Sequence, residues 1–520
     1  MEQARELQKR MAHGTRIDTT LELVLDEENS SDLLEDERVK IDCRPLYQCI
    51  HIHDKLGRRN EFKKHYEEDR QAQIDLILKT KISLTPEGQK TFTNMLQEVL
   101  GFFIVEHRVA HTTQEFRSKA RVEVLWTMVA ERITRAISDA VRRCSDLDAL
   151  SHVKETVTLF IPALERYTFD TRKPQELSQA LIERCAALTL LQCTAQFKKH
   201  VEEDGFKPMQ VKDEKEYRIM RGLYRFPEDS DAKQKGFPRM VPFSSVVPLT
   251  CADLKRSIDQ FYAFAVTETG HPVIPQVDMI ARESVDMLLG TTVPGVLSER
   301  LKTNSMAQVV QINVNVEHFG NVCTEFETFL AERQVVAPPD HKPIKLKACE
   351  SFVTARKHAE KRIFELINGK IDEFLRATEY DWMPKRPRTQ PAGYLTELTA
   401  YLKEIFTTAI TNLPAGITSF VRINAMDHVA TTMNKMLLGP QVKKFNLHFV
   451  ATIDVDVSFL ERFVEDMGDP MLLEVFVELR QVITLLMSDN RNEYLDVQMR
   501  NRKYSRLKPA LVMSLFEKLR

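Results

Sequence analysis

Apolar side chains recur every three or four residues along most of the chain, the spacing that places them on one face of an α-helix. Turns rich in glycine or proline separate these periodic ranges, because both residues disfavour a helix interior. The ranges predicted to be helical are 46–78 with a break at Gly57, 90–142, 147–166, 176–203, 251–267, 277–301, 352–374, 395–406, 423–438, 442–464 and 472–487. Further breaks are expected near Asp146, Pro162 and Pro174. Short connections of this kind predict neighbouring antiparallel helices.

One stretch shows the two-residue period of a β-strand instead. Val310, Ile312, Val314 and Val316 alternate with polar residues, which by itself is typical of a strand. No second strand with suitable turn residues follows nearby, and an isolated strand leaves its backbone groups without ladder partners. We therefore predict that this stretch is helical.

Prolines and glycines gather in the segment 205–248, which predicts a loop and domain junction with a short helix at 214–223. The chain is long enough for several packed units, so the predicted fold is all-α, an elongated rod of tandem helical bundles. The expected parts are a helix stub at 1–23 with an acidic linker at 24–40, an N-terminal bundle region at 41–204, a middle region at 205–390 and a C-terminal bundle at 391–520.

Composition supports this interpretation and narrows the function. Glycine provides only 16 of 520 residues, which favours helices over strand-and-turn folds. The eight cysteines are scattered without paired spacing, which predicts neither a disulfide framework nor a zinc site and fits the cytoplasm. A net charge of −2 gives no indication of a nucleic-acid partner. No apolar run is long enough to span a membrane, so any membrane association is expected to be peripheral or indirect.

Candidate catalytic and metal-binding patterns are incomplete. Glu106, His107 and His111 put two imidazoles four residues apart, but a third ligand is not identifiable. His51 and His53 are two residues apart and point to different faces of a helix. Glycine-rich phosphate loops and the serine nucleophile turn are absent from the sequence. We therefore predict that the protein is not an enzyme and has no metal, no cofactor and no small-molecule substrate.

Basic residues concentrate near the end of the chain. They could meet anionic lipid head groups, which would make the protein a peripheral membrane-binding scaffold. A solvated helix face, or pairing with an acidic partner subunit, explains the same residues. A smaller cluster, Lys385, Arg386 and Arg388, lies in a proline-rich turn. The candidate basic patch consists of Arg500, Arg502, Lys503, Arg506 and Lys508.

Several phrases, in the same order along the chain, resemble one known family. They include GFFIVEHRVAH at 101–111, KIDEFLRATEYDW at 370–382, GYLTELTAYLKEIF at 393–406, FVELRQVITLLMSD at 476–489 and KYSRLKPALVMSLFEK at 503–518. With DCRPLYQCIHIHDKLGRRNEFKKHYEEDRQAQIDLIL at 42–78, the resemblance covers about residues 41–518. The chain is similar to the Sec-fifteen subunit family of the exocyst tethering complex.

The resemblance implies a helical rod that binds other exocyst subunits and helps to tether and dock secretory vesicles at the plasma membrane before fusion. It places the protein in the cytoplasm, peripheral at secretory or recycling vesicles and at exocytic sites. Family members are longer and carry an N-terminal coiled coil, of which 1–23 is expected to be the stub.

The family's C-terminal bundle is an effector surface for GTP-bound Rab-type GTPases, which the resemblance places at 428–463. Asp454 stands where the family has an asparagine implicated in that contact. The implied Rab-binding residues are Phe449, Ile453, Asp454, Asp456 and Val457.

Overall fold

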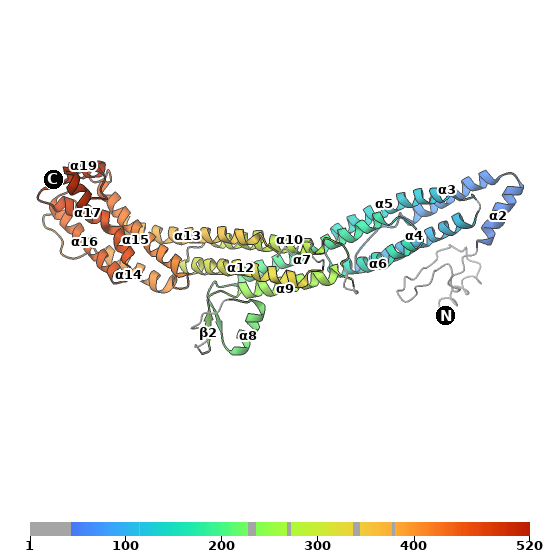
Figure 1. The fold of residues 1–520 in the computed structure, drawn as a ribbon, viewed down its shortest axis with the longest axis horizontal. Coiled ribbons are helices and arrows are strands. Elements are labelled where there is room, and N and C mark those ends of the chain that lie inside the picture. Colours follow the sequence, from blue (N-terminus) through green and yellow to red (C-terminus); the bar gives the residue numbers. More distant parts are fainter. Residues whose placement is uncertain (1–42, 114, 227–235, 268–271, 336–343, 377–379) are drawn as a thin grey trace. The chain divides into compact units, whose positions relative to one another are not determined.

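The computed structural model describes residues 43–113, 115–226, 236–267, 272–335, 344–376 and 380–520. These residues are mostly helical (Figure 1), which confirms the all-α fold class. The predicted helix at 1–23 and the linker at 24–40 lie outside the described residues.

The described chain forms two compact units. The first contains residues up to Gln192, Arg256–Ser284 and the short stretch 333–335, and the second contains Cys193–Lys255, Val285–Glu332 and everything described from residue 344 onward. The predicted boundaries at 204 and 390 stay predictions.

In the first unit, α4 packs against α3, α5 and α6. The predicted hairpin at 46–78 is confirmed as α2 and α3, and the turn between them uses Gly57 at φ +67°, a left-handed conformation that glycine adopts without strain. The helices of this unit are α2 (Arg44–Lys55), α3 (Arg59–Ile77), α4 (Pro86–Thr112), α5 (Lys119–Arg143), α6 (Leu147–Arg166) and parts of α7 (Arg172–Glu203), α9 (Val246–Ala265) and α10 (Val277–Met287).

Two predictions for this unit are wrong in detail. The range 90–142 is two helices, with a break between Thr112 and Lys119. The break expected at Pro162 does not occur, because α6 continues through it to Arg166. Phe160 and Leu164 on either side are fully buried, and their packing holds the helix together although proline removes one backbone hydrogen bond.

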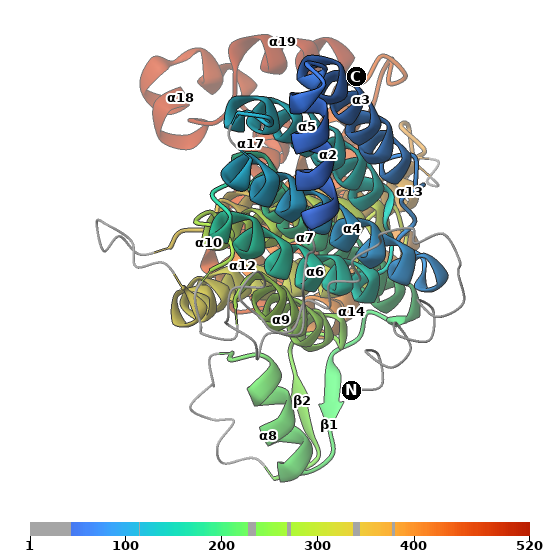
Figure 2. The same cartoon turned by 90° about the vertical axis from the view of Figure 1, so that its right-hand side faces the viewer.

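The second unit begins with the end of α7, which is followed by a short helix and a two-stranded ribbon. The predicted short helix is confirmed as α8 (Glu214–Leu223), capped by Asp213, whose side chain accepts from the Glu216 N–H at 2.8 Å. It lies beside an antiparallel ribbon of β1 (Met209–Val211) and β2 (Arg239–Val241), as Figure 2 shows. The ribbon was not predicted, because three-residue strands are too short to show a period.

The remaining helices of the second unit follow in chain order. They are α11 (Val293–Arg300), α12 (Met306–Arg333), α13 (Ala348–Arg376), α14 (Gly393–Glu404), α15 (Ala415–Leu438), α16 (Leu447–Glu465), α17 (Val477–Met487), α18 (Val497–Lys503) and α19 (Pro509–Lys518). Short turns of other helix types are η2 (Leu288–Thr292) and η3 (Ile405–Ala409), which are π-helical, and η4 (Pro470–Phe476) and η5 (Arg491–Leu495), which are 3₁₀.

Helix α12 contains the strand-like stretch, so the helical prediction for 310–316 is confirmed. The stretch looks alternating because α12 is buried on several faces, and its polar residues are buried with the apolar ones. Gln311 donates to the Pro242 carbonyl at 2.7 Å, and Asn315 bonds both the N–H and the hydroxyl of Ser244 at 3.0 and 2.8 Å. These bonds fix the segment after β2 to the helix.

Candidate functional site

Helix α16 carries all five residues that the resemblance implies for Rab binding. It begins after Asn446, whose side chain caps the Phe449 N–H at 2.9 Å, so the predicted start at 442 is five residues early. Four of the five side chains lie inside the bundle, each no more than 1% exposed: Phe449, Ile453, Asp456 and Val457. A partner that binds the surface of α16 can therefore contact Asp454 directly, but not the four buried side chains.

Asp456 is a buried carboxylate that anchors a distant loop. We call residues 380–392, between α13 and α14, the strap. The Asp456 Oδ1 accepts from the Ala392 N–H at 2.8 Å, and the Arg388 guanidinium pairs with Oδ2 at 2.5 Å. Burial raises the pKa of Asp456, and the Ala392 N–H and Arg388 only partly oppose this effect. The Arg388 N–H also donates to the Thr452 hydroxyl at 3.0 Å.

The beginning of the strap covers the N-terminal end of α16. The rings of Trp382 and Phe449 have centroids 4.7 Å apart. The Asn446 N–H donates to the Trp382 carbonyl at 3.2 Å, and the Asn446 side chain donates to the Pro384 carbonyl at 2.9 Å. One side of α16 is thus sealed by the strap through apolar, hydrogen-bonding and ionic contacts.

Asp454 lies on the opposite, solvent-accessible side, with its side chain 34% exposed. Arg480 of α17 pairs with Asp454 and also with Glu461, to which its Nε donates at 3.0 Å. Desolvation disfavours the charged guanidinium, but the hydrogen bonds and charges of Glu461 and Asp454 outweigh it and raise the pKa of Arg480. The sequence did not reveal this clamp, because Arg480 is 26 residues from Asp454.

The predicted basic patch lies on α18 and on the turn that leads to α19, and ion pairs neutralise part of it. Lys503 pairs with Glu493 at 3.2 Å, and Arg506 lies 3.9 Å from Glu474. Arg500 is half-buried, with its guanidinium 5.9 Å from the Tyr494 ring centroid. Arg502 and Lys508 are exposed and form no ion pair within the described residues.

In the first unit, Glu106 and His111, two of the residues considered as metal ligands, form hydrogen bonds within the protein. Glu106 is fully buried and accepts from Arg70 at 2.6 Å, from Arg117 at 2.7 Å and from the Tyr66 hydroxyl at 3.0 Å. Its oxygens are therefore occupied. His111 Nδ1 bonds the His107 carbonyl at 2.8 Å. Across the residues that the structure describes, there is no group of three His, Cys, Asp or Glu placed to hold a metal ion.

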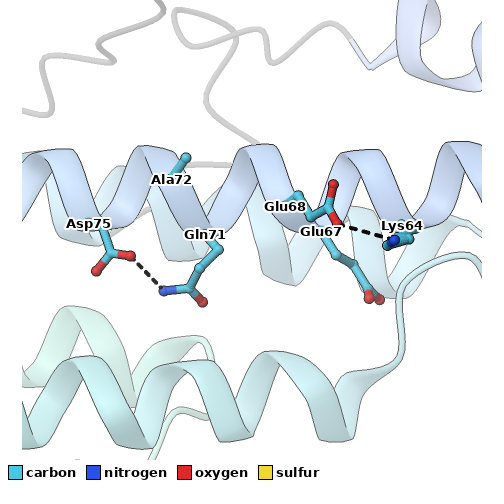
Figure 3. A pocket seen from close by; sticks show the side chains of 6 residues that line it. All are labelled: Lys64, Glu67, Glu68, Gln71, Ala72 and Asp75. Atoms are coloured by element: carbon cyan, nitrogen blue, oxygen red, sulfur yellow. Dashed lines mark hydrogen bonds and ion pairs between the residues drawn. The ribbon is translucent and has the colours of Figure 1, made fainter.

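A shallow hollow runs along the surface of α3 (Figure 3). Its lining residues come from that one helix, and two of its contacts are the Lys64–Glu68 ion pair at 3.7 Å and the Gln71–Asp75 hydrogen bond at 3.2 Å. Polar groups on one helix face that pair with each other are an ordinary solvated surface. Two of its carboxylates, Glu67 and Asp75, are also paired with Arg121 and Arg132 of α5, so the acidic groups of the hollow are already occupied.

The chain resembles known proteins over most of its length. Residues 175–518 match the family model described as "Exocyst complex subunit Sec15 C-terminal". Two relatives are Exocyst complex component 6B of Mus musculus, 28% identical over 96% of this chain and 62% of its own length, and Exocyst complex component 6 of Homo sapiens, 28% identical over 97% and 63%. Exocyst complex component sec15 of Schizosaccharomyces pombe is 28% identical over 99% and 67%.

The chain thus spans less than two thirds of the length of the two mammalian relatives. A solved structure titled "Crystal Structure of Sec15 C-terminal domain" is 22% identical, with a TM-score of 0.43 over 60% of this chain and 98% of that one. Among the described residues, no helix is both long enough and apolar enough to cross a membrane.

Proposed function

Since the chain belongs to the Sec15 family of exocyst subunits, we propose that it helps to tether and dock secretory vesicles at the plasma membrane before fusion, in complex with other exocyst subunits. The observation that carries the proposal is the family match over residues 175–518. The helical bundles of both units support it, since their long exposed helix faces suit assembly with other helical chains. The matched family is one of complex subunits and not of enzymes.

Co-purification tests membership of the complex. The full chain, tagged at its N-terminus, is isolated from its own cells and the associated chains are identified by mass spectrometry. We expect several exocyst subunits in amounts comparable to the tagged chain. Recovery of the chain without them would contradict the proposal, whereas a subset would identify the direct neighbours.

The finer part of the proposal is that a GTP-bound Rab-type GTPase binds the exposed side of α16 and α17. Asp454 supports this, since it is the accessible member of the five implied residues. Asp454→Arg should weaken binding about tenfold or more, because it places a cation beside Arg480 and removes an acceptor. Asp456 is unsuitable for this test because the strap depends on it.

Pull-down with Rab GTPases loaded with a GTP analogue or with GDP measures the effect. We expect binding only in the GTP-bound state, loss in Asp454→Arg, and no change in the matched control Glu465→Arg at the exposed end of α16. Equal recovery in both nucleotide states would exclude an effector role.

A second candidate is peripheral membrane association through the predicted basic patch, which the exposure of Arg502 and Lys508 favours. Vesicle flotation with anionic lipid is the test. Replacing Arg500, Arg502, Lys503, Arg506 and Lys508 with serine should abolish flotation if this patch contacts the lipid. Flotation that persists in that variant would exclude it.

A further inference from the structure

Three distant segments of the chain meet at the turn between α15 and α16. Phe445 exchanges backbone hydrogen bonds with the last residues: its N–H donates to the Lys518 carbonyl and its carbonyl accepts from the Arg520 N–H, both at 2.9 Å. The next residue, Asn446, bonds the carbonyls of Trp382 and Pro384 in the strap. The turn therefore holds both the strap and the last residues by hydrogen bonds, in the bundle at the red end of the colour bar in Figure 1.

This convergence gathers basic residues that are far apart in the sequence. Lys385 and Arg386 directly follow Pro384, and Lys443 and Lys444 directly precede Phe445. Each lies within two residues of a hydrogen-bonded position, a reach of less than about 7 Å along the chain. All are exposed. We call the set the junction patch: Lys385, Arg386, Lys443, Lys444 and Arg520.

The cations of the junction patch differ from those of the predicted basic patch in their partners. Within the described residues, none of its five members forms an ion pair, whereas Lys503 and Arg506 of the predicted basic patch face Glu493 and Glu474. Like charges held close together repel one another, so a bound anion relieves this repulsion as well as gaining direct attraction. Lys518 is excluded from the set because its ammonium donates to the carbonyls of Leu438 and Gly439 at 2.6 and 2.8 Å.

The surroundings of the junction patch distinguish between anionic partners. Two apolar side chains beside it, Met383 and Leu447, are 38% and 45% exposed. Two exposed acidic residues, Asp381 and Glu517, also lie next to it in the sequence. An anionic bilayer presents a continuous negative plane, which meets these acids as well as the cations. An acidic polypeptide can place its carboxylates over the cations alone and an apolar side chain against Met383 or Leu447.

We propose that the junction patch binds an acidic segment of a partner protein, one that carries an apolar residue among its carboxylates. This inference is independent of the function proposed above, since it requires only the described contacts. Binding through exposed charges is expected to weaken steeply as salt is raised.

The test uses the full chain and a fluorescein-labelled peptide with one leucine between two runs of four glutamates, followed by fluorescence anisotropy at about 50 mM salt. The variant Lys385→Ser/Arg386→Ser/Lys443→Ser/Lys444→Ser should bind the peptide at least about tenfold more weakly, since each exposed pair contributes modestly and four are removed. The matched control, Arg500→Ser/Arg502→Ser/Arg506→Ser/Lys508→Ser, removes the same charge elsewhere and should bind within about twofold of the unchanged protein.

Equal weakening in both variants, or none in the first, would overturn the proposal. So would patch-dependent binding to phosphatidylcholine vesicles with one-fifth phosphatidylserine in the absence of peptide binding, because the ligand would then be a bilayer. Circular dichroism melting checks that each variant is folded. If the fourfold variant melts at a lower temperature, the double variant Lys443→Ser/Lys444→Ser should still reduce the affinity for the peptide at least about threefold. In binding free energy, this is about half of the effect expected for the fourfold variant.

Discussion

The α2–α3 hairpin of the first unit and helix α16 of the second are held in place by different forces. None of the residues of α2, all of them described, is buried, and α3 buries only Ile74. Helix α16 buries eight residues, most of them apolar. The hairpin is attached through ion pairs. Glu106 of α4 is fully buried and binds Arg70 of α3 and Arg117. Two further carboxylates of α3, Glu67 and Asp75, pair with arginines of α5. Apolar burial thus holds α16 in place, whereas a buried ionic cluster and ring contacts hold the α2–α3 hairpin.

A fully buried carboxylate serves each region, in α4 beside the hairpin and within α16 itself, and the two have different roles. Glu106 lies between two guanidinium groups and a tyrosine hydroxyl, and it joins helices that share little apolar surface. Asp456 has one guanidinium and one backbone N–H, and it holds a loop over a helix that is already packed. A buried charge can therefore be the principal attachment of an element or an addition to an apolar one.

The largest effect is expected from an apolar truncation in α16. Phe449→Ala removes a buried ring that contacts Trp382 and should lower the free energy of unfolding of its bundle by about 4 kcal/mol. Urea denaturation combined with hydrogen exchange of α16 peptides measures it. Leu447→Ala, two residues earlier and 45% exposed, should cost less than about 1 kcal/mol. Similar losses in the two variants would mean that burial does not fix α16.

Glu106→Ala should cost nearly as much, about 3 kcal/mol, because it leaves Arg70 and Arg117 without their buried partner. Hydrogen exchange should rise in α3 before it rises in α5. Glu68→Ala is the control, since that side chain is 59% exposed and pairs with Lys64 at the surface. If α3 kept its protection in Glu106→Ala, the cluster would not be what holds the hairpin.

The pH dependence of Asp456 gives a smaller effect. Because its pKa is raised in the folded protein, the folded state binds more protons than the unfolded state just above the ordinary pKa of a carboxyl group, near 3.8. This group therefore adds stability as the pH falls toward that value, and the contribution disappears as the pH rises. Asp456→Asn should remove this part of the pH profile. Urea midpoints measured across the acidic range check it, and parallel profiles of the two proteins would contradict it.

The smallest effect is expected at the hairpin turn. Gly57→Ala places a β-carbon at φ +67° and should destabilise the hairpin by about 1 kcal/mol. Gly369→Ala in α13 has open space around it and an ordinary helical conformation, so it should be neutral or slightly stabilising. Thermal melting and exchange of α2 peptides compare the two. A stabilising Gly57→Ala would show that the turn does not need its left-handed residue.

Most of the helical architecture could be predicted from sequence because helix period is a local signal. The hairpin break at Gly57 and the helix at 214–223 follow from such signals, as does the helical interpretation of 310–316. Pro162 was misjudged because tertiary packing of Phe160 and Leu164 outweighs a local preference. The break near Thr112 was missed because the apolar period continues across it.

The candidate site was harder to predict because its contacts join residues far apart in the chain. The pairing of Arg388 with Asp456 spans 68 residues and that of Glu106 with Arg70 spans 36, and no periodic pattern records either. Lys385 and Arg386 were visible as a basic turn, but their meeting with Lys443 and Lys444 depends on the folded bundle. The packing of Phe449 against Trp382 likewise depends on the strap, which sequence places only as a loop.

The backbone bonds between Phe445 and the last residues have a practical consequence for labelling the protein. A fluorescent protein or affinity tag fused directly after Arg520 would emerge beside the turn that begins α16. Its bulk would crowd the junction patch and strain the two hydrogen bonds at Phe445. Localisation or interaction experiments with such a fusion would then report on an altered surface.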